Sequence, residues 1–214
     1  MISGWPKTRL VFLLTGLWLA LFALYSLTYS GVLTASDEEG LVVSMENLVK
    51  GKPPIYQYGY GVNVELPFEP GQVLLAAPLY ALAAHQPAWG NAQTVLIFNI
   101  FITAATACVL LLFVRRLGYS ESVSLAVALL YGLGTLAWPY SKVLFREPLS
   151  TLALLLAAYF LWGLRAAGHR GIGYTVGQIT LGGCFLVLAI ATKESSIVVA
   201  AALGILAVIF LMGG

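Results

Sequence analysis

Three adjacent carboxylates, those of Asp37, Glu38 and Glu39, stand at the end of a long uncharged run. Carboxylates crowded at an apolar boundary repel one another and resist ionisation, a property that a general base or a metal ligand uses. The same residues fit an acidic N-cap, in which Ser36 or Asp37 begins a surface helix that runs to Val49. The two interpretations are compatible, because a cap holds the carboxylates rigidly.

A second group of charges lies in residues 140–147, directly before another apolar run. Glu147 precedes Pro148, and proline suits the first turn of a helix, so a helix start also explains this position. Charges such as those of Arg146 and Glu147 are nevertheless costly at the boundary of a membrane-crossing helix unless they are paired or face water. If Glu147 faces the first group of acids, two carboxylates lie across one cleft.

Lys193 and Glu194 divide 42 otherwise uncharged residues. Because apolar segments flank them on both sides, the natural interpretation is a tight reversal at a membrane surface. Lys193 is then either the snorkelling tip of a simple hairpin or a cation that binds an anionic group such as a lipid phosphate.

Tyrosine occupies every second position in one short stretch, at Tyr56, Tyr58 and Tyr60. This alternation predicts an extended segment at the membrane interface, where amphipathic rings are favoured. The rings could equally line a sugar site, because sugars stack on aromatic faces.

The composition requires that these residues be positioned by membrane helices. The 214 residues are 60% hydrophobic and 9% charged, with a mean hydropathy of +0.90. Soluble domains are roughly 45–50% apolar and about 25% charged. Disorder is excluded by the high apolar content. A net charge of +2 provides no basic field for a nucleic-acid partner.

The uncharged runs predict an all-α fold, a single transmembrane domain over residues 1–214 with about six transmembrane helices. We expect these helices at residues 10–30, 91–114, 122–139, 148–164, 173–192 and 195–212. Residues 71–84 are flanked and interrupted by prolines and are too short for a crossing. They predict a surface or re-entrant helix within a large extracytoplasmic loop, 31–90.

The basic residues orient the predicted helices. Placing the Lys and Arg of the short loops inside makes the N-terminus cytoplasmic, although only six of the eleven basic residues then lie inside. The acids are more asymmetric, because eight of nine, all but Glu121, fall outside. They lie in the 31–90 loop, in the 140–147 loop and at residues 193–194. Acids do not set topology, so their clustering calls for a functional explanation.

Four stretches occur in order along this outer face. They are an Asp-Glu pair before a helix that ends in Gly (37–38 and 48–51), a YGxG…PGQxLLAxPLYxLA-like stretch (60–61 and 70–83), a YSKxxFxEPLSTLxLLLAxY-like loop and span (140–159) and an ATK turn (191–193). In this order they resemble the N-terminal half of polytopic glycosyltransferases of the GT-C class, of the protein O-mannosyltransferase and aminoarabinose-transferase type. Members of that class continue through further spans, so the resemblance also predicts a C-terminal truncation.

The resemblance implies an inverting glycosyltransferase of the plasma (inner) membrane. Its donor would be a polyprenyl-phosphate sugar that enters laterally from the membrane lipids, and its acceptor a hydroxyl of a protein or glycolipid. Asp37 would deprotonate or orient that hydroxyl, while Glu38 and Glu147 would shape the acceptor or metal site.

The resemblance also suggests the substrate-binding residues. Lys193, with Arg146, would neutralise the leaving phosphate, and Tyr60 and Tyr140 belong to the matching stretches as further binding candidates. A divalent cation is compatible with such an enzyme, but no ligand spacing indicates one, so metal and cofactor stay unknown.

The competing interpretation is a transporter or flippase-like membrane protein with no catalytic activity, in which Asp37, Glu147 and Lys193 are pathway charges. A non-catalytic membrane scaffold is a third alternative. Transporters tend to have paired repeats and helices broken at mid-membrane, whereas here the ionisable residues collect at one face. Convergence of the three residues on one outward cavity would favour the enzyme.

Overall fold

The computed structural model describes residues 6–53, 55–57, 63–65, 69–166 and 170–212, and it confirms the predicted all-α class. Five helices are long and apolar enough to cross a bilayer, which makes the chain a multi-pass membrane protein by length and composition. They are α1 (Lys7–Leu27), α4 (Asn91–Arg116), α7 (Glu147–Trp162) continued by η2 (Gly163–Ala166), α9 (Ile172–Thr192), and α10 (Ile197–Met212) preceded by η3 (Glu194–Ser196).

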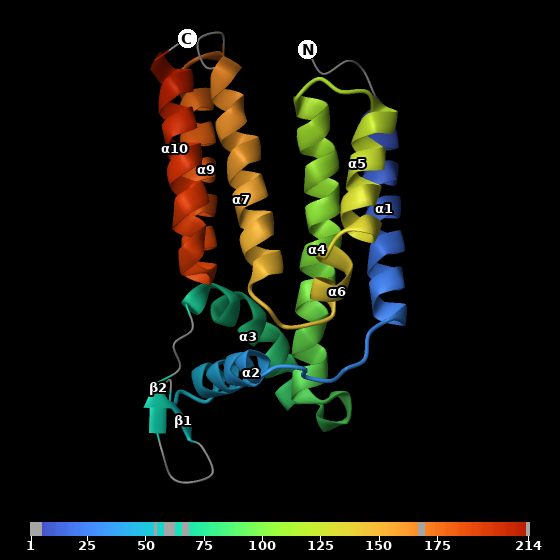
Figure 1. Ribbon diagram of the computed structural model, residues 1–214, viewed down its shortest axis with the longest axis vertical. Helices are drawn as coiled ribbons and strands as arrows, with labels where there is room; N and C mark the ends of the chain where they lie inside the picture. The colour runs from blue at the N-terminus through green and yellow to red at the C-terminus, as the bar shows by residue number, and fades with distance from the viewer. Residues whose placement is uncertain (1–5, 54, 58–62, 66–68, 167–169, 213–214) are drawn as a thin grey trace.

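Figure 1 shows the upright helices as two groups, with α1, α4 and α5 (Glu121–Gly134) in one and α7, α9 and α10 in the other. The groups are in contact, because α7 packs along α4. The start of α1 and the end of α10 lie at one end, which we call the inner end after the predicted orientation. At the opposite, outer end lie α2 (Ser36–Val49), α3 (Pro70–Ala84) and a two-stranded hairpin.

The helix α2 has the bounds that the sequence predicts, beginning at Ser36 and ending at Val49. The prediction of its cap is wrong by one position. Ala35, in an extended conformation, is the N-cap in place of Ser36 or Asp37, and the side chain of Glu38 accepts its backbone N–H at 2.9 Å, which is one half of a capping box. A carboxylate three residues into a helix can satisfy backbone N–H groups that no helical carbonyl reaches.

The remainder of the 31–90 loop contains a second surface helix and a short antiparallel pair of strands. The helix α3 begins at Pro70, which confirms the helix expected at residues 71–84. The strands are β1 (Ile55–Gln57) and β2 (Asn63–Glu65). Tyr56 lies in β1, as the alternating tyrosines predict, whereas Tyr58 and Tyr60 lie outside the described residues.

The continuous helix expected at residues 122–139 is not present. The helix α5 ends at Gly134, Thr135 is extended, and a five-residue helix α6 (Ala137–Ser141) follows. The Thr135 hydroxyl donates to the Tyr131 carbonyl at 2.7 Å and accepts from the Ala137 N–H at 3.1 Å. Local hydrogen bonds of this kind compete with the helical pattern. At about 1.5 Å per residue, α5 is shorter than a bilayer core of about 30 Å.

Tight packing at the outer end joins α2 and α3 to the upright helices. Leu41 and Met45 of α2 are completely buried against Tyr80 of α3 and Val95 and Leu96 of α4. By contrast, few residues of α1 and α10 are buried, namely Leu17, Leu21 and Tyr25 in α1 and Ala200 in α10, as expected of helices in contact with lipid. The outer end is therefore a packed unit that can hold polar side chains in fixed positions.

One close backbone approach ties α3 to the end of α9. A Cβ atom built on Gly71 would lie 2.5 Å from the Thr192 hydroxyl and 2.7 Å from the Ala191 carbonyl oxygen. We therefore expect Gly71→Ala to separate the two helices and to lower the free energy of unfolding by about 1–3 kcal/mol, measured by thermal denaturation in detergent. Gly183→Ala is the matched control, because a Cβ atom on Gly183 meets nothing within 4 Å. Equal effects of the two substitutions would contradict this account.

Candidate functional site

The carboxylate of Glu38 is completely buried and joins two connections of the outer end. Its Oε2 accepts hydrogen bonds from the N–H groups of Thr34 (2.5 Å) and Ala35 (2.9 Å) and from the Thr34 hydroxyl (2.9 Å). Its Oε1 accepts from the Leu144 N–H, 2.6 Å away, in the α6–α7 loop (residues 142–146). Both oxygens are thus engaged, and the side chain fixes the loop that precedes α7.

Two buried amide side chains hold the same loop from the other side. Gln72 Nε2 in α3 donates to the carbonyls of Leu144 (3.1 Å) and Phe145 (3.2 Å). Asn99 Nδ2 in α4 donates to the carbonyls of Val143 (2.6 Å) and Phe145 (2.7 Å). Both amide side chains are fully buried. Buried backbone groups must be paired, so three helices supply the partners that this irregular segment lacks.

The fixed loop presents two ion pairs at the surface of the outer end. Lys193 Nζ lies 2.5 Å from Glu147 Oε1, and Arg146 pairs with Glu69. The other oxygen of Glu69 accepts the backbone N–H of Glu194 at 2.7 Å. These five residues form what we call the charge cluster. It connects the starts of α3 and α7 with the α9–η3 turn, and its side chains are partly exposed.

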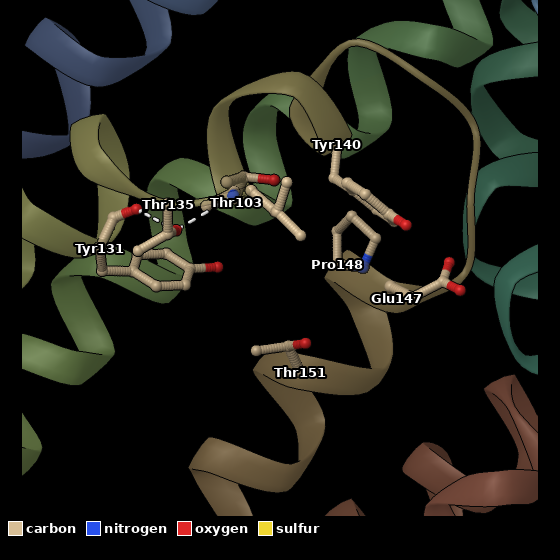
Figure 2. Close-up of a pocket in the computed structure, with 9 residues that line it drawn as sticks. Thr103, Tyr131, Thr135, Tyr140, Glu147, Pro148 and Thr151 are labelled. Carbon is tan, nitrogen blue, oxygen red and sulfur yellow. Dashed lines mark hydrogen bonds between the residues drawn. The ribbon is translucent and has the colours of Figure 1, made fainter.

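A cavity of about 430 Å³, the outer cavity, opens beside this cluster between α4, α5, α6 and α7. Its lining consists of Thr103, Tyr131, Thr135, Leu136, Ala137, Tyr140, Glu147, Pro148 and Thr151. Figure 2 shows Tyr140 and Glu147 at one side, and Thr103, Tyr131 and Thr135 at the other. The hydroxyl of Thr103 is buried and has no hydrogen-bond partner among the described residues. Glu147 therefore belongs to both the cavity and the charge cluster.

Four of the seven predicted site residues lie in the charge cluster or line the outer cavity. Glu147, Lys193 and Arg146 come together in the charge cluster, and Tyr140 lines the outer cavity. Asp37 is exposed in the first turn of α2 and is not among the described residues that line the cavity.

The two remaining predicted residues are Tyr60 and Glu38. Tyr60 lies outside the described residues. Glu38 is fully buried in its four hydrogen bonds and acts as a positioning residue.

Sequence reasoning missed Glu69, Gln72, Asn99 and Thr103. Glu69 carries a readable signal, because it precedes Pro70 at a helix start as Glu147 precedes Pro148. An isolated amide in an apolar span, such as Asn99, also indicates a hydrogen bond between helices.

The described residues include no group of three or more His, Cys, Asp or Glu side chains that could hold a metal ion. Among the acids at this end, Glu38, Glu69 and Glu147 are paired with cations or with backbone N–H groups. Whether the protein binds a divalent cation stays an open question.

Several groups at the outer end have shifted pKa values with clear causes, among them Tyr29, Glu46 and Lys50. Burial raises the pKa of Tyr29 to about 12, so its hydroxyl stays a donor at neutral pH and binds the Gln93 carbonyl at 2.5 Å. The hydrogen bond from Lys50 lowers the pKa of Glu46, and the same pair raises the pKa of Lys50. The Tyr29 hydrogen bond joins the end of α1 to the start of α4, whereas the Glu46–Lys50 pair lies at the last turn of α2.

Comparisons with protein-family models, with curated proteins and with solved structures find no match to this chain.

The role of Glu38 can be tested by Glu38→Gln. The substitution keeps the side-chain size but turns one acceptor oxygen into an NH₂ group that faces an N–H donor. We expect the free energy of unfolding to fall by about 1–3 kcal/mol and the Leu144 amide to exchange hydrogen faster. Asp37→Asn, at an exposed position in the same turn, should change neither. We call this role of Glu38 the clamp. Unchanged hydrogen exchange of the Leu144 amide in Glu38→Gln would contradict it.

Proposed function

We propose that this chain forms the lipid-phosphate site of a membrane glycosyltransferase. The enzyme moves a sugar from a polyprenyl-phosphate donor to an acceptor hydroxyl at the outer membrane face, in the manner of the GT-C class. What carries the proposal is the position of Glu147, which lines the outer cavity and also pairs with Lys193, next to the pair of Arg146 with Glu69.

The arrangement suits a substrate with an anionic head and an apolar tail. Lys193 and Arg146 are cations at the end of membrane helices, where the phosphate of a lipid lies. The outer cavity lies directly beside them, and its largely apolar lining suits the first part of the lipid chain. The unpartnered Thr103 hydroxyl adds one hydrogen-bonding group to that lining.

Each cation already has a carboxylate partner, and this pairing shapes the proposed mechanism. A donor phosphate competes with Glu147 for Lys193 and with Glu69 for Arg146. The carboxylates keep the cations oriented while the site is empty, since an unpaired charge at this boundary is costly. When phosphate replaces Glu147 on Lys193, the Glu147 carboxylate becomes available to the acceptor.

The chemistry is a displacement at the anomeric carbon. The acceptor oxygen attacks that carbon, the bond from the carbon to the phosphate oxygen breaks, and the phosphate leaves with the bonding electron pair. The hydroxyl proton goes to a carboxylate, for which the family resemblance suggests Asp37. Asp37 is an exposed acid of the outer end that does not line the outer cavity, so this role requires the acceptor to bind outside the cavity. Lys193 and Arg146 stabilise the charge that develops on the phosphate.

The phosphate site is tested with polyprenyl phosphate, the lipid that is released whatever the sugar. We expect Lys193→Gln to weaken its binding to the detergent-solubilised chain about tenfold or more, as measured by native mass spectrometry. Lys52→Gln removes an equal charge from an exposed position of the same outer face and should leave binding unchanged. An equal loss of polyprenyl-phosphate binding in both variants would show that general surface charge is responsible, and it would contradict a specific site.

The base is tested by sugar transfer from labelled polyprenyl-phosphate donors to membrane acceptors. We expect Asp37→Asn to reduce the transfer rate at least a hundredfold, which is the usual contribution of general base catalysis, while membrane insertion and abundance stay normal. Glu39→Gln is the matched control from the same helical turn. Transfer at the original rate in Asp37→Asn would remove Asp37 from this role.

A further inference from the structure

A second cavity, of about 560 Å³ and with a more polar lining than the outer cavity, lies at the inner end, where α4 ends, α7 continues into η2 and α9 begins. We call it the arginine pocket. It is lined chiefly by three arginines and by aromatic or amide side chains, namely Arg116, Arg165, Arg170, Tyr159, Trp162, Tyr174 and Gln178. No feature of the proposed transferase requires such a cavity at the end opposite the charge cluster.

Arg116 is held in place by neutral groups. Its Nη1 donates to the Tyr159 carbonyl at 2.7 Å, and its Nη2 donates to the Tyr174 hydroxyl and to Gln178 Oε1, both at 3.0 Å. The guanidinium also lies 4.4 Å above the centroid of the Tyr159 ring. A guanidinium has five N–H groups, and these contacts use three. Two donors therefore remain for a ligand, as far as the described residues show.

The other two arginines rest on aromatic rings. The guanidinium carbon of Arg165 is 4.6 Å from the centroid of the Trp162 ring, and that of Arg170 is 5.1 Å from that of Tyr174. Contacts of this kind orient a cation but do not neutralise it. The Tyr174 hydroxyl accepts a hydrogen bond from Arg116, so its own proton can be donated to a ligand oxygen.

The arginine pocket has no counter-charge of its own in the described part of the chain. None of its three arginines forms an ion pair there, and the acid at the inner end, Glu121, is bound to Arg9 at 3.1 Å. The other eight acids belong to the outer end. Three like charges around one cavity repel one another, and an anion between them removes that repulsion.

A purely structural role explains only part of this arrangement. Arg116 does satisfy the Tyr159 carbonyl in the last turn of α7, as a helix C-cap would. That role requires one arginine and no cavity, whereas Arg165 and Arg170 donate no hydrogen bond to the backbone among the described contacts. Their shared feature is that they border the same cavity as Arg116.

We propose that the arginine pocket binds the phosphate group of an anionic membrane lipid. Guanidinium groups match phosphate oxygens in geometry and charge, and basic pockets between membrane helices on the cytoplasmic side take anionic headgroups. The aromatic side chains that share the lining are typical of the membrane interface, which is the depth of a lipid phosphate. A free phosphate ion would use the same arginines but not the interface.

The test is a titration of the detergent-solubilised full chain with phosphatidylglycerol and, separately, with phosphatidylcholine, followed by native mass spectrometry. We expect phosphatidylglycerol to bind at least tenfold more tightly. The double variant Arg165→Gln/Arg170→Gln should lose most of that preference, because both residues are exposed and their replacement should leave the fold intact. Lys7→Gln, an exposed cation of the same inner end, should keep it.

A second variant separates geometry from charge. A Cβ atom on Gly163 would overlap Gln178 Oε1 and Arg116 Nη2, so Gly163→Ala should move the guanidinium without removing any charge. We expect a severalfold loss of phosphatidylglycerol binding in this variant.

Three outcomes would overturn the proposal. They are equal binding of the two lipids, a loss in Lys7→Gln as large as in the double variant, and binding of inorganic phosphate with none of phosphatidylglycerol. This test does not depend on the proposed transferase activity.

Discussion

The outer end of this protein depends on one buried carboxylate. Glu38 accepts four hydrogen bonds, three from the connection between α1 and α2 and one from the α6–α7 loop, 106 residues further along the chain. An isolated buried charge is very costly, and only complete hydrogen bonding makes such a position stable. The carboxylate therefore requires both connections to be in place, and it fixes the point from which α7 starts.

The positions of Arg146 and Glu147 depend on that carboxylate, because it binds the loop that leads to them. Glu38, Gln72 and Asn99 together supply partners for the backbone of the α6–α7 loop. Arg146 and Glu147, at the end of the loop, can then reach Glu69 and Lys193 across the molecule. The acid at a helix start thus serves two different purposes in this chain, as a structural clamp in α2 and as an ion-pair partner in α7.

The two ends of the molecule have opposite electrostatic character. At the outer end, acids and bases are paired beside a cavity, so a charged ligand must exchange with an existing partner. At the inner end, the arginines of the arginine pocket rest on neutral side chains, so an anion adds charge balance without displacing a carboxylate. This difference is what the two proposals rest on, exchange of a lipid phosphate at the outer end and retention of an anionic lipid at the inner end.

The sequence by itself determined the membrane class, the bounds of α2 and the surface helix at α3, because these follow from local composition, prolines and acids at helix starts. It placed the α9–η3 turn at residues 193–194 for the same reason. It could not show that residues 122–139 break at Thr135, or that Glu38 is buried while Asp37 is exposed. Those outcomes, like the pairing of Glu147 with Lys193, were decided by tertiary structure. Each depends on whether a polar group binds a nearby backbone group or a side chain far away in the sequence. A local sequence pattern does not show which distant group lies within hydrogen-bond distance.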